Sequence, residues 1–172
     1  MADIRDGESY FDAAQQRHRD AVLLFKHNQY SGASYLAGCA IEAMFWAFIP
    51  ENERVSQRGR HDLQILYEVG LGAKFEAIYV QRFRLGAVRD NTELQNFDRL
   101  TREISINMTN ARLRWTNSYR YYPDSKLREF VRKTRPLRTG RPGDILRSSV
   151  NILLEACQFF IALGIQKQGW IG

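Results

Sequence analysis

The stretch AAQQRHRDAVLLFKHNQYSGASYLAGCAIEAMFWAFI (residues 13–49) decides the fold. In its first half, apolar residues recur at helical spacing and polar residues fall mostly on the other side, which predicts a surface helix with one buried stripe. The second half is apolar nearly all round, with Glu42 as its one charged residue, so that helix must be covered on several sides. The turn HNQYSG joins the two, Ser31 suits the N-cap of the second helix, and Pro50 marks its end.

A second nearly all-apolar helix is expected near the C-terminus. It begins at Ile145 after the turn RTGRPGD, runs through Ile165, and ends within residues 164–169. Polar residues interrupt its first half, so we do not expect it to span a membrane. Two central helices that need covering predict an all-α protein, a bundle of four to six helices built around them.

The bulk composition fits one soluble domain over residues 1–172. Apolar and charged fractions of 44% and 26% are those of an ordinary globular chain. The start MADIRDGE is charged and no apolar run follows it, so no secretory signal is expected. Cys39 and Cys157 each lie within an apolar helix, the usual place for a buried free thiol, and this favours the cytoplasm over an oxidising compartment.

The middle of the chain predicts shorter helices. His61-Asp62-Leu63 opens one, with Asp62 as N-cap, and Gly70 and Gly72 are expected to break it. Helical periodicity resumes over 73–88 and again over 91–106. No clear period is apparent over 107–123, and Asp124 then starts the helix DSKLREFVRK.

Positive charge is concentrated between residues 112 and 147. That segment holds eleven basic and three acidic residues, a net charge of +8, whereas the whole chain carries +6, so the remainder sums to −2. Arginine dominates, and Trp115, Tyr119, Tyr121 and Tyr122 are interleaved with it, which suits phosphate contacts and base stacking. The alternative is a solvated face that keeps the protein soluble or lines a dimer seam.

The order of these elements resembles the HEPN superfamily, small helical bundles that accompany nucleotidyltransferases, toxin–antitoxin pairs and antiviral systems. The likeness rests on RHRDAVLLFKHNQY followed by SGASYLAGCAIEAMFWAF, on the helix start His61-Asp62-Leu63, and on YRYYPD before the last helices. It implies a helical bundle, RNA or a nucleotide as ligand, and dimerisation.

By this resemblance, the catalytic members of the superfamily are metal-independent endoribonucleases. Their active site is built around an Arg that is followed, after four to six other residues, by a His. In such a pair an imidazole moves a proton from the ribose 2′-hydroxyl while a guanidinium binds the scissile phosphate. In the toxin branch the motif is Arg, four residues, His, one residue, Tyr. Here Arg114, Tyr119 and Tyr121 have that spacing, but Tyr119 replaces the His, and a phenol with a pKa near 10 is a poor base at neutral pH.

Other chemistries have weaker support in the sequence. Arg54 and His61 satisfy the looser Arg-to-His spacing, although His61 also suits a helix start held by backbone or a carboxylate. His18 and His27 are expected on the solvated side and at the end of the first helix. The chain has no Cys-x-x-Cys or His-Glu-x-x-His motif, and VGLGAKF is not a phosphate loop, so neither a metal nor a cofactor is predicted.

Three hypotheses follow from the sequence. The first is a HEPN-like protein that binds RNA or nucleotides without efficient catalysis, through Arg112, Arg114, Arg120, Arg132 and Arg138, with Trp115 or Tyr119 as stacking platforms. The second is a metal-independent endoribonuclease of a toxin or antiviral defence system. It would use either Arg54 with His61, or Arg114 with a His brought in by the fold or by a second subunit. The third is a homodimeric structural partner of a nucleotidyltransferase, with no membrane contact.

Overall fold

The computed structural model describes residues 7–57, 59–84, 91–134 and 145–167, and these form helices and no strand, which confirms the all-α prediction. The predicted hairpin is formed by α1 (Gly7–Lys26) and α2 (Tyr30–Phe48), which pack along their length. The connecting turn reverses at Asn28, whose φ of 59° lies in the left-handed region where asparagine is one of the tolerated residues. Phe11, Ala14 and Ala21 form the buried stripe of α1, as expected.

The start of α2 differs from the prediction. Ser31 lies inside the helix and does not cap it, and the residue before the helix, Gln29, gives no side-chain cap either. Instead, the cap comes from Asp124, a residue 93 positions after Ser31 in the sequence. Its Oδ1 accepts a hydrogen bond from Ser31 N at 2.7 Å, and its Oδ2 accepts one from Tyr30 N at 3.4 Å. A carboxylate is well suited there because the amide groups of a helix N-terminus lack partners within the helix.

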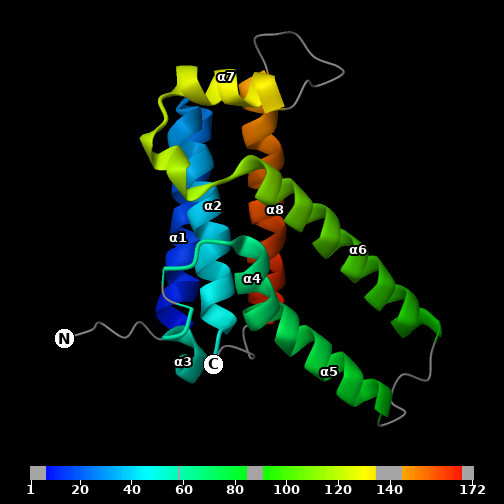
Figure 1. The fold of residues 1–172 in the computed structure, drawn as a ribbon. Coiled ribbons are helices and arrows are strands. Elements are labelled where there is room, and N and C mark those ends of the chain that lie inside the picture. The colour runs from blue at the N-terminus through cyan, green and yellow to red at the C-terminus, as the bar shows by residue number, and fades with distance from the viewer. Residues whose placement is uncertain (1–6, 58, 85–90, 135–144, 168–172) are drawn as a thin grey trace.

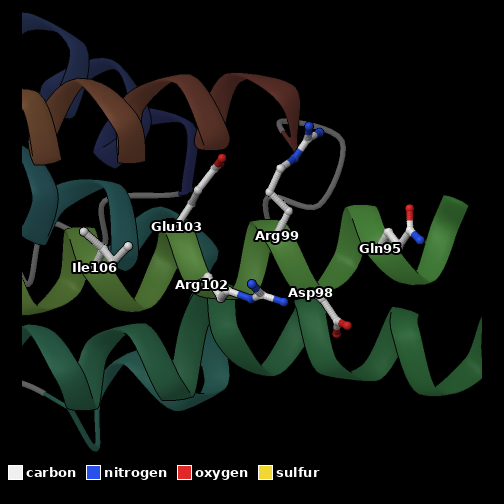
Figure 2. A pocket seen from close by; sticks show the side chains of 6 residues that line it. All are labelled: Gln95, Asp98, Arg99, Arg102, Glu103 and Ile106. Atoms are coloured by element: carbon white, nitrogen blue, oxygen red, sulfur yellow. The ribbon is translucent and has the colours of Figure 1, made fainter.

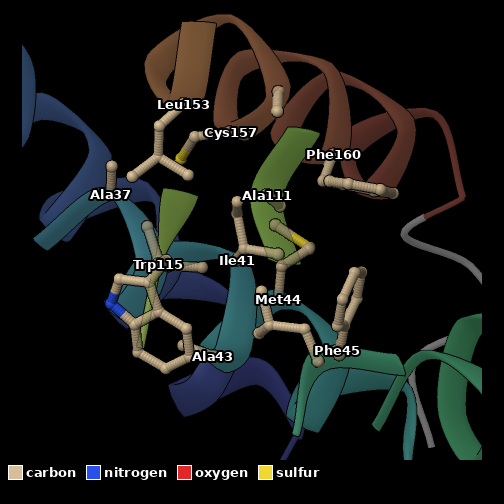
Figure 3. Packing of buried hydrophobic residues seen from close by; sticks show 14 of the residues in the cluster. Ala37, Ile41, Ala43, Met44, Phe45, Ala111, Trp115, Leu153, Cys157 and Phe160 are labelled. Carbon is tan, nitrogen blue, oxygen red and sulfur yellow. The ribbon is translucent and has the colours of Figure 1, made fainter. Parts of the chain in front are cut away.

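The two predicted central helices form the core. α8 (Ile145–Gln166) packs against α2, and both contribute fully buried side chains such as Phe45, Leu153 and Phe160. Figure 3 shows these residues with Trp115 and Ala111 between the two helices. By length and composition α8 alone among the described helices could cross a membrane, but 56% of its apolar window is buried inside the bundle, as in the core helix of a soluble protein.

Two glycines allow the core helices to pack closely. The Trp115 ring lies directly against Gly38 of α2, so that a Cβ added there would overlap the indole. Gly164 of α8 similarly faces Met44 of α2. Gly38 therefore permits the close approach of the Trp115 ring. Cys39 and Cys157 are both free thiols, one half-buried and one buried.

The helix that begins after Asp62 does not break at its glycines. α3 (Glu51–Arg54) is a single turn, and α4 (Leu63–Tyr67) then continues through the π-helical turn η1 (Glu68–Gly72) directly into α5 (Ala73–Arg84). Asp62 caps α4 as predicted, accepting from Gln64 N at 2.8 Å. Gly70 is needed for packing rather than for a break, because a Cβ there would lie 2.7 Å from the Phe45 carbonyl oxygen.

Helical structure also extends further along the chain than predicted after residue 106. α6 (Asn91–Arg114) includes half of the segment in which no period was apparent, and Ile104, Met108, Ala111 and Trp115 form one buried stripe at helical spacing. The 3₁₀ turn η2 (Asn117–Tyr121) follows, and then α7 (Asp124–Thr134), whose start at Asp124 confirms the prediction.

Figure 1 shows how these helices are arranged. α1, α2 and α8 stand side by side, and α7 crosses the end of the bundle at which α2 and α8 begin. The C-terminal part of α6 packs against α8, whereas α5 and the N-terminal part of α6 extend away from the other helices (Figure 1). The molecule thus has a compact three-helix body, a cap made of η2 and α7, and a projecting arm.

Candidate functional site

The cap end of the body gathers positive charge from several elements. α1 ends there, α2 and α8 begin there, and η2 and α7 lie over it (Figure 1). We call this surface the basic end; its described cations are Lys26, Arg120, Lys126, Arg128, Arg132, Lys133 and Arg147. The N-termini of two long helices add partial positive charge at the same end, which increases the attraction for anions.

The carboxylates of α7 do little to neutralise this end. Asp124 is used by the two amides at the start of α2, and Glu129 is bonded to Lys133 at 2.6 Å, one helical turn away. That exposed ion pair lowers the pKa of Glu129, with the hydrogen bond from Lys133 as the main cause. Arg120, Lys126 and Arg132 are exposed on the same two elements. The basic end therefore presents cations to solvent.

Aromatic rings lie beside two of these cations. The Arg120 guanidinium lies 4.7 Å from the centroid of the Tyr121 ring, which is 71% exposed. The Lys126 ammonium lies 4.6 Å from the centroid of the Tyr122 ring. Guanidinium and phenol side by side can bind a phosphate and stack on a base, which is how single-stranded nucleic acid is held without sequence preference.

The two predicted stacking platforms are buried, and this part of the prediction is wrong. Trp115 is 5% exposed and fills the space beside Gly38, while Tyr119 is 3% exposed and packs on Phe130 and Tyr122. Their ring faces are covered by protein. The buried indole nitrogen of Trp115 also lacks a hydrogen-bond partner among the described residues. Tyr121 is the exposed aromatic of this segment.

The predicted arginines do not form one cluster. Arg114 is half-buried and its guanidinium bonds the Asn110 side chain at 2.9 Å, one turn back along α6. Arg112 is exposed at the end of α6, and Arg132 is exposed on α7. Arg138 lies outside the described residues. Of the motif Arg114, Tyr119, Tyr121, only Tyr121 is freely exposed to solvent.

The structure also brings together a row of polar groups that the sequence reasoning missed. His61 Nδ1 lies 3.0 Å from Glu42 Oε1, so the one charged residue of α2 holds the imidazole, as the alternative of a neighbouring carboxylate anticipated. Burial raises the pKa of the Glu42 carboxyl, while hydrogen bonds from His61 and Trp46 and the nearby Arg17 act in the opposite direction. The His61 side chain remains 47% exposed.

The same row continues along α2 toward the basic end. Tyr35 and Cys39 lie one helical turn apart on the same face of α2. Burial raises the pKa of the Cys39 thiol, while the nearby Tyr35 hydroxyl and the Arg120 charge act in the opposite direction. We call the row formed by Arg17, Tyr35, Cys39, Glu42, His61 and Arg120 the polar seam. The sequence did contain a signal for this row, namely the helical spacing of Tyr35, Cys39 and Glu42. That spacing places three side chains with polar atoms on one face of an otherwise apolar helix.

The remaining histidines and Arg54 occupy different environments. Arg54 is 7% exposed and its guanidinium lies 5.7 Å from the centroid of the Tyr10 ring, a buried position that does not suit a group binding a scissile phosphate. His18 is half-buried rather than solvated, and burial lowers its pKa. His27 is exposed just after α1, as predicted.

Two surface hollows lie near charged groups. One, of about 510 Å³, opens at the basic end between Phe25 of α1 and the first turns of α8, beside Arg147. The other is formed on α6 alone, and Figure 2 shows that its charged side chains fan out in different directions rather than converging: Arg99 and Glu103 point to one side of the helix, and Asp98 and Arg102 to the other. The second hollow is therefore a surface depression rather than a site.

Among the described residues, no three His, Cys, Asp or Glu side chains lie together in a way that could hold a metal ion. The chain matches no protein-family model, no curated protein and no solved structure in the comparisons. The basic end and the polar seam are the arrangements on which the proposed functions below rest.

Proposed function

We propose that this protein is a HEPN-like bundle that binds RNA or nucleotides at its basic end. The observation that carries the proposal is the Arg120–Tyr121 pair, exposed on η2 beside further exposed cations of α7, in a region whose two described carboxylates are already engaged. Phosphate neutralisation supplies most of the affinity in such an interface, and ring stacking adds a contribution that tolerates any base. The cytoplasm, where RNA is present, remains the expected location.

Salt dependence provides the first test. Binding of a short labelled single-stranded RNA, followed by fluorescence polarisation, should weaken steeply as salt rises from about 50 to 200 mM. Arg120→Ala combined with Arg132→Ala should reduce the slope of log K against log salt by about 1.4, because a single strand gives about 0.7 per neutralised phosphate. Tyr121→Leu should weaken binding by about 1–3 kcal/mol, the usual contribution of one stacked base.

A matched control separates this site from general charge. Arg99→Ala combined with Arg102→Ala removes the same two charges from the arm, where both arginines are exposed on α6. It should leave the affinity and slope nearly unchanged. Equal losses in the two double variants, or binding that is insensitive to salt, would refute the proposed location.

A second candidate function, metal-independent RNA cleavage, is favoured by the Glu42–His61 contact. With Nδ1 held by the carboxylate at 3.0 Å, the other ring nitrogen of His61 is available to take the proton of a ribose 2′-hydroxyl. The 2′-oxygen would then attack phosphorus, the 5′-oxygen would leave and take up a proton, and a 2′,3′-cyclic phosphate would form. Arg17 or Arg120 of the seam could bind the phosphate while its charge develops.

Incubation of RNA with the pure protein in EDTA tests this candidate. Cleavage should stop in His61→Ala and continue in His27→Ala, the matched change at an exposed histidine outside the seam. Glu42→Gln should slow cleavage, because the imidazole loses the carboxylate that orients its ring. No cleavage of any RNA by the unaltered protein would reject this candidate and leave the binding proposal intact.

A further inference from the structure

A small hollow on the arm is lined by aromatic and acidic side chains. It lies between the continuous helix α4–η1–α5 and the facing side of α6, and its volume is about 270 Å³. Pockets that take drug-sized ligands start at about 300 Å³, so this one suits a smaller molecule. It is lined by Tyr67, Glu68, Gly72, Phe75, Glu76, Tyr79, Phe97, Thr101 and Ile104.

Aromatic rings make up the walls of this hollow. Phe97 of α6 stacks on Tyr79 at a centroid distance of 3.6 Å and on Phe75 at 5.6 Å, so three rings form one slab between α5 and α6. Tyr67 is held by an edge-to-face contact with the core residue Phe45 at 5.6 Å. These contacts anchor the rings on two helices, which preorganises the aromatic surface.

The polar groups of the hollow are acidic. Glu68 and Glu76 are both exposed, and they stand four residues before and four residues after Gly72 on the same face of the helix. None of the nine lining residues is basic, although the chain as a whole carries a net charge of +6. The Gln64 amide donates to Glu68 at 2.6 Å, which holds that carboxylate in place.

Gly72 lets the Tyr67 ring approach the backbone between the two glutamates. Gly72 closes the π-helical turn η1, and a Cβ added to it would lie 2.8 Å from the Tyr67 ring and from the Tyr67 carbonyl oxygen. A larger residue at this position would therefore displace Tyr67. Single π-helical turns inside α-helices occur frequently at functional sites, where the extra residue changes which side chains share a face.

A cation of the chain itself already lies on this aromatic slab. The Lys167 ammonium, just beyond the end of α8, is 5.9 Å from the centroid of the Phe75 ring, within the range of a cation–π contact. This contact is independent of the two carboxylates and shows that a ring of the slab packs against an ammonium group.

We propose that the hollow between α5 and α6 binds a small organic ammonium ion. Ring faces attract a cation through their quadrupole, and the attraction is greatest for quaternary ammonium groups, which are weakly hydrated and apolar at the surface. Glu68 and Glu76 supply the opposite charge at the rim. The site lies on the arm, away from the basic end, and does not depend on the proposed RNA binding.

Choline and its uncharged isostere 3,3-dimethylbutan-1-ol provide the direct test, because the two molecules share shape and differ in charge. Isothermal calorimetry with the full chain should give millimolar binding of choline and binding of the isostere that is about tenfold weaker or worse. Equal binding of the two would mean that the hollow recognises only apolar shape. Absence of choline binding at every concentration that leaves the protein folded would also overturn the proposal.

Charge variants locate the site. Glu68→Gln combined with Glu76→Gln should weaken choline binding by about threefold or more. The matched control is Asp98→Asn combined with Glu103→Gln on α6, which removes the same charge outside this hollow and should leave binding unchanged. Equal weakening in both pairs, or no weakening in the first, would contradict the assignment. Far-UV circular dichroism checks that each variant keeps its helical content.

A lysine-containing peptide distinguishes the two sources of such a cation. A short peptide with one trimethyllysine should compete with choline only if the hollow is open enough for a protein side chain. Competition by the peptide would extend the ligand class to modified proteins, while its absence alongside choline binding would restrict the site to free small molecules. Either result retains the ammonium ion as the recognised group.

Discussion

Asp124→Ala is the most informative single substitution in this protein, because one carboxylate joins the start of α7 to the start of α2. The substitution removes the acceptors of the Ser31 amide at 2.7 Å and of the Tyr30 amide at 3.4 Å. Neither Gln29 nor another side chain of the preceding turn caps α2 in its place. The two amides would be left to water or without partners.

The magnitude follows from known helix caps. Loss of a capping side chain costs about 0.5–2 kcal/mol, and loss of a negative charge at a helix N-terminus costs about 0.3–1 kcal/mol. The two terms overlap, so we expect the free energy of unfolding to fall by about 1–2 kcal/mol. For a chain of this size that corresponds to a decrease of about 2–8 °C in Tm.

Urea denaturation and thermal melts of matched variants measure the effect. Asp124→Asn keeps an acceptor oxygen and loses the charge, so it should lie between the natural protein and Asp124→Ala. Glu129→Ala on the same helix removes an exposed ion pair and should change stability far less than Asp124→Ala does. If Asp124→Ala were no more destabilising than Glu129→Ala, the cap between distant segments would not contribute as argued.

Three further predictions concern the core and its pH dependence. Gly38→Ala should destabilise the protein by about 1–3 kcal/mol in urea, because the new Cβ would overlap the buried Trp115 ring, and a neutral outcome would mean that the ring can move aside. Leu153→Ala, at a fully buried site, should cost about 2–5 kcal/mol, whereas Leu23→Ala, 56% exposed, should cost far less; similar losses would contradict the assigned core. Burial lowers the pKa of His18 below its ordinary value of 6.5, so on acidification the unfolded chain takes up the His18 proton before the folded protein does. The free energy of unfolding should therefore fall as the pH drops through about 6.5. His18→Gln should remove that part of the pH dependence of stability, and an unchanged pH dependence would show that His18 does not supply it.

Most of the fold could be predicted from the sequence where a local pattern is strong. The hairpin of α1 and α2, the C-terminal core helix, the cap by Asp62 and the start of α7 at Asp124 all follow from apolar spacing and turn residues within a few positions of each element. The period of 104, 108, 111 and 115 was present in the sequence as well, but polar residues between these positions obscured it.

Other features depend on contacts between distant segments. Gly70 suggested a break by its propensity, yet it continues the helix because its bare backbone packs against Phe45 of α2. Trp115 looked like an exposed stacking residue among arginines, and only the packing against Gly38 and the core shows that it is buried. The polar seam was missed because Glu42 and His61 are nineteen residues apart and meet only after α4 has packed on α2.

The sequence by itself determined that the chain is all-helical, which segments form its core, and that its positive charge is concentrated in the last third, since these properties depend on residue type and on spacing along one helix. The tertiary structure decided which of those charges face solvent, which carboxylate caps which helix, and which rings are available to a ligand. The physical reason is that burial and partnership depend on side chains supplied by other helices, and their positions are set by packing rather than by neighbours in the chain.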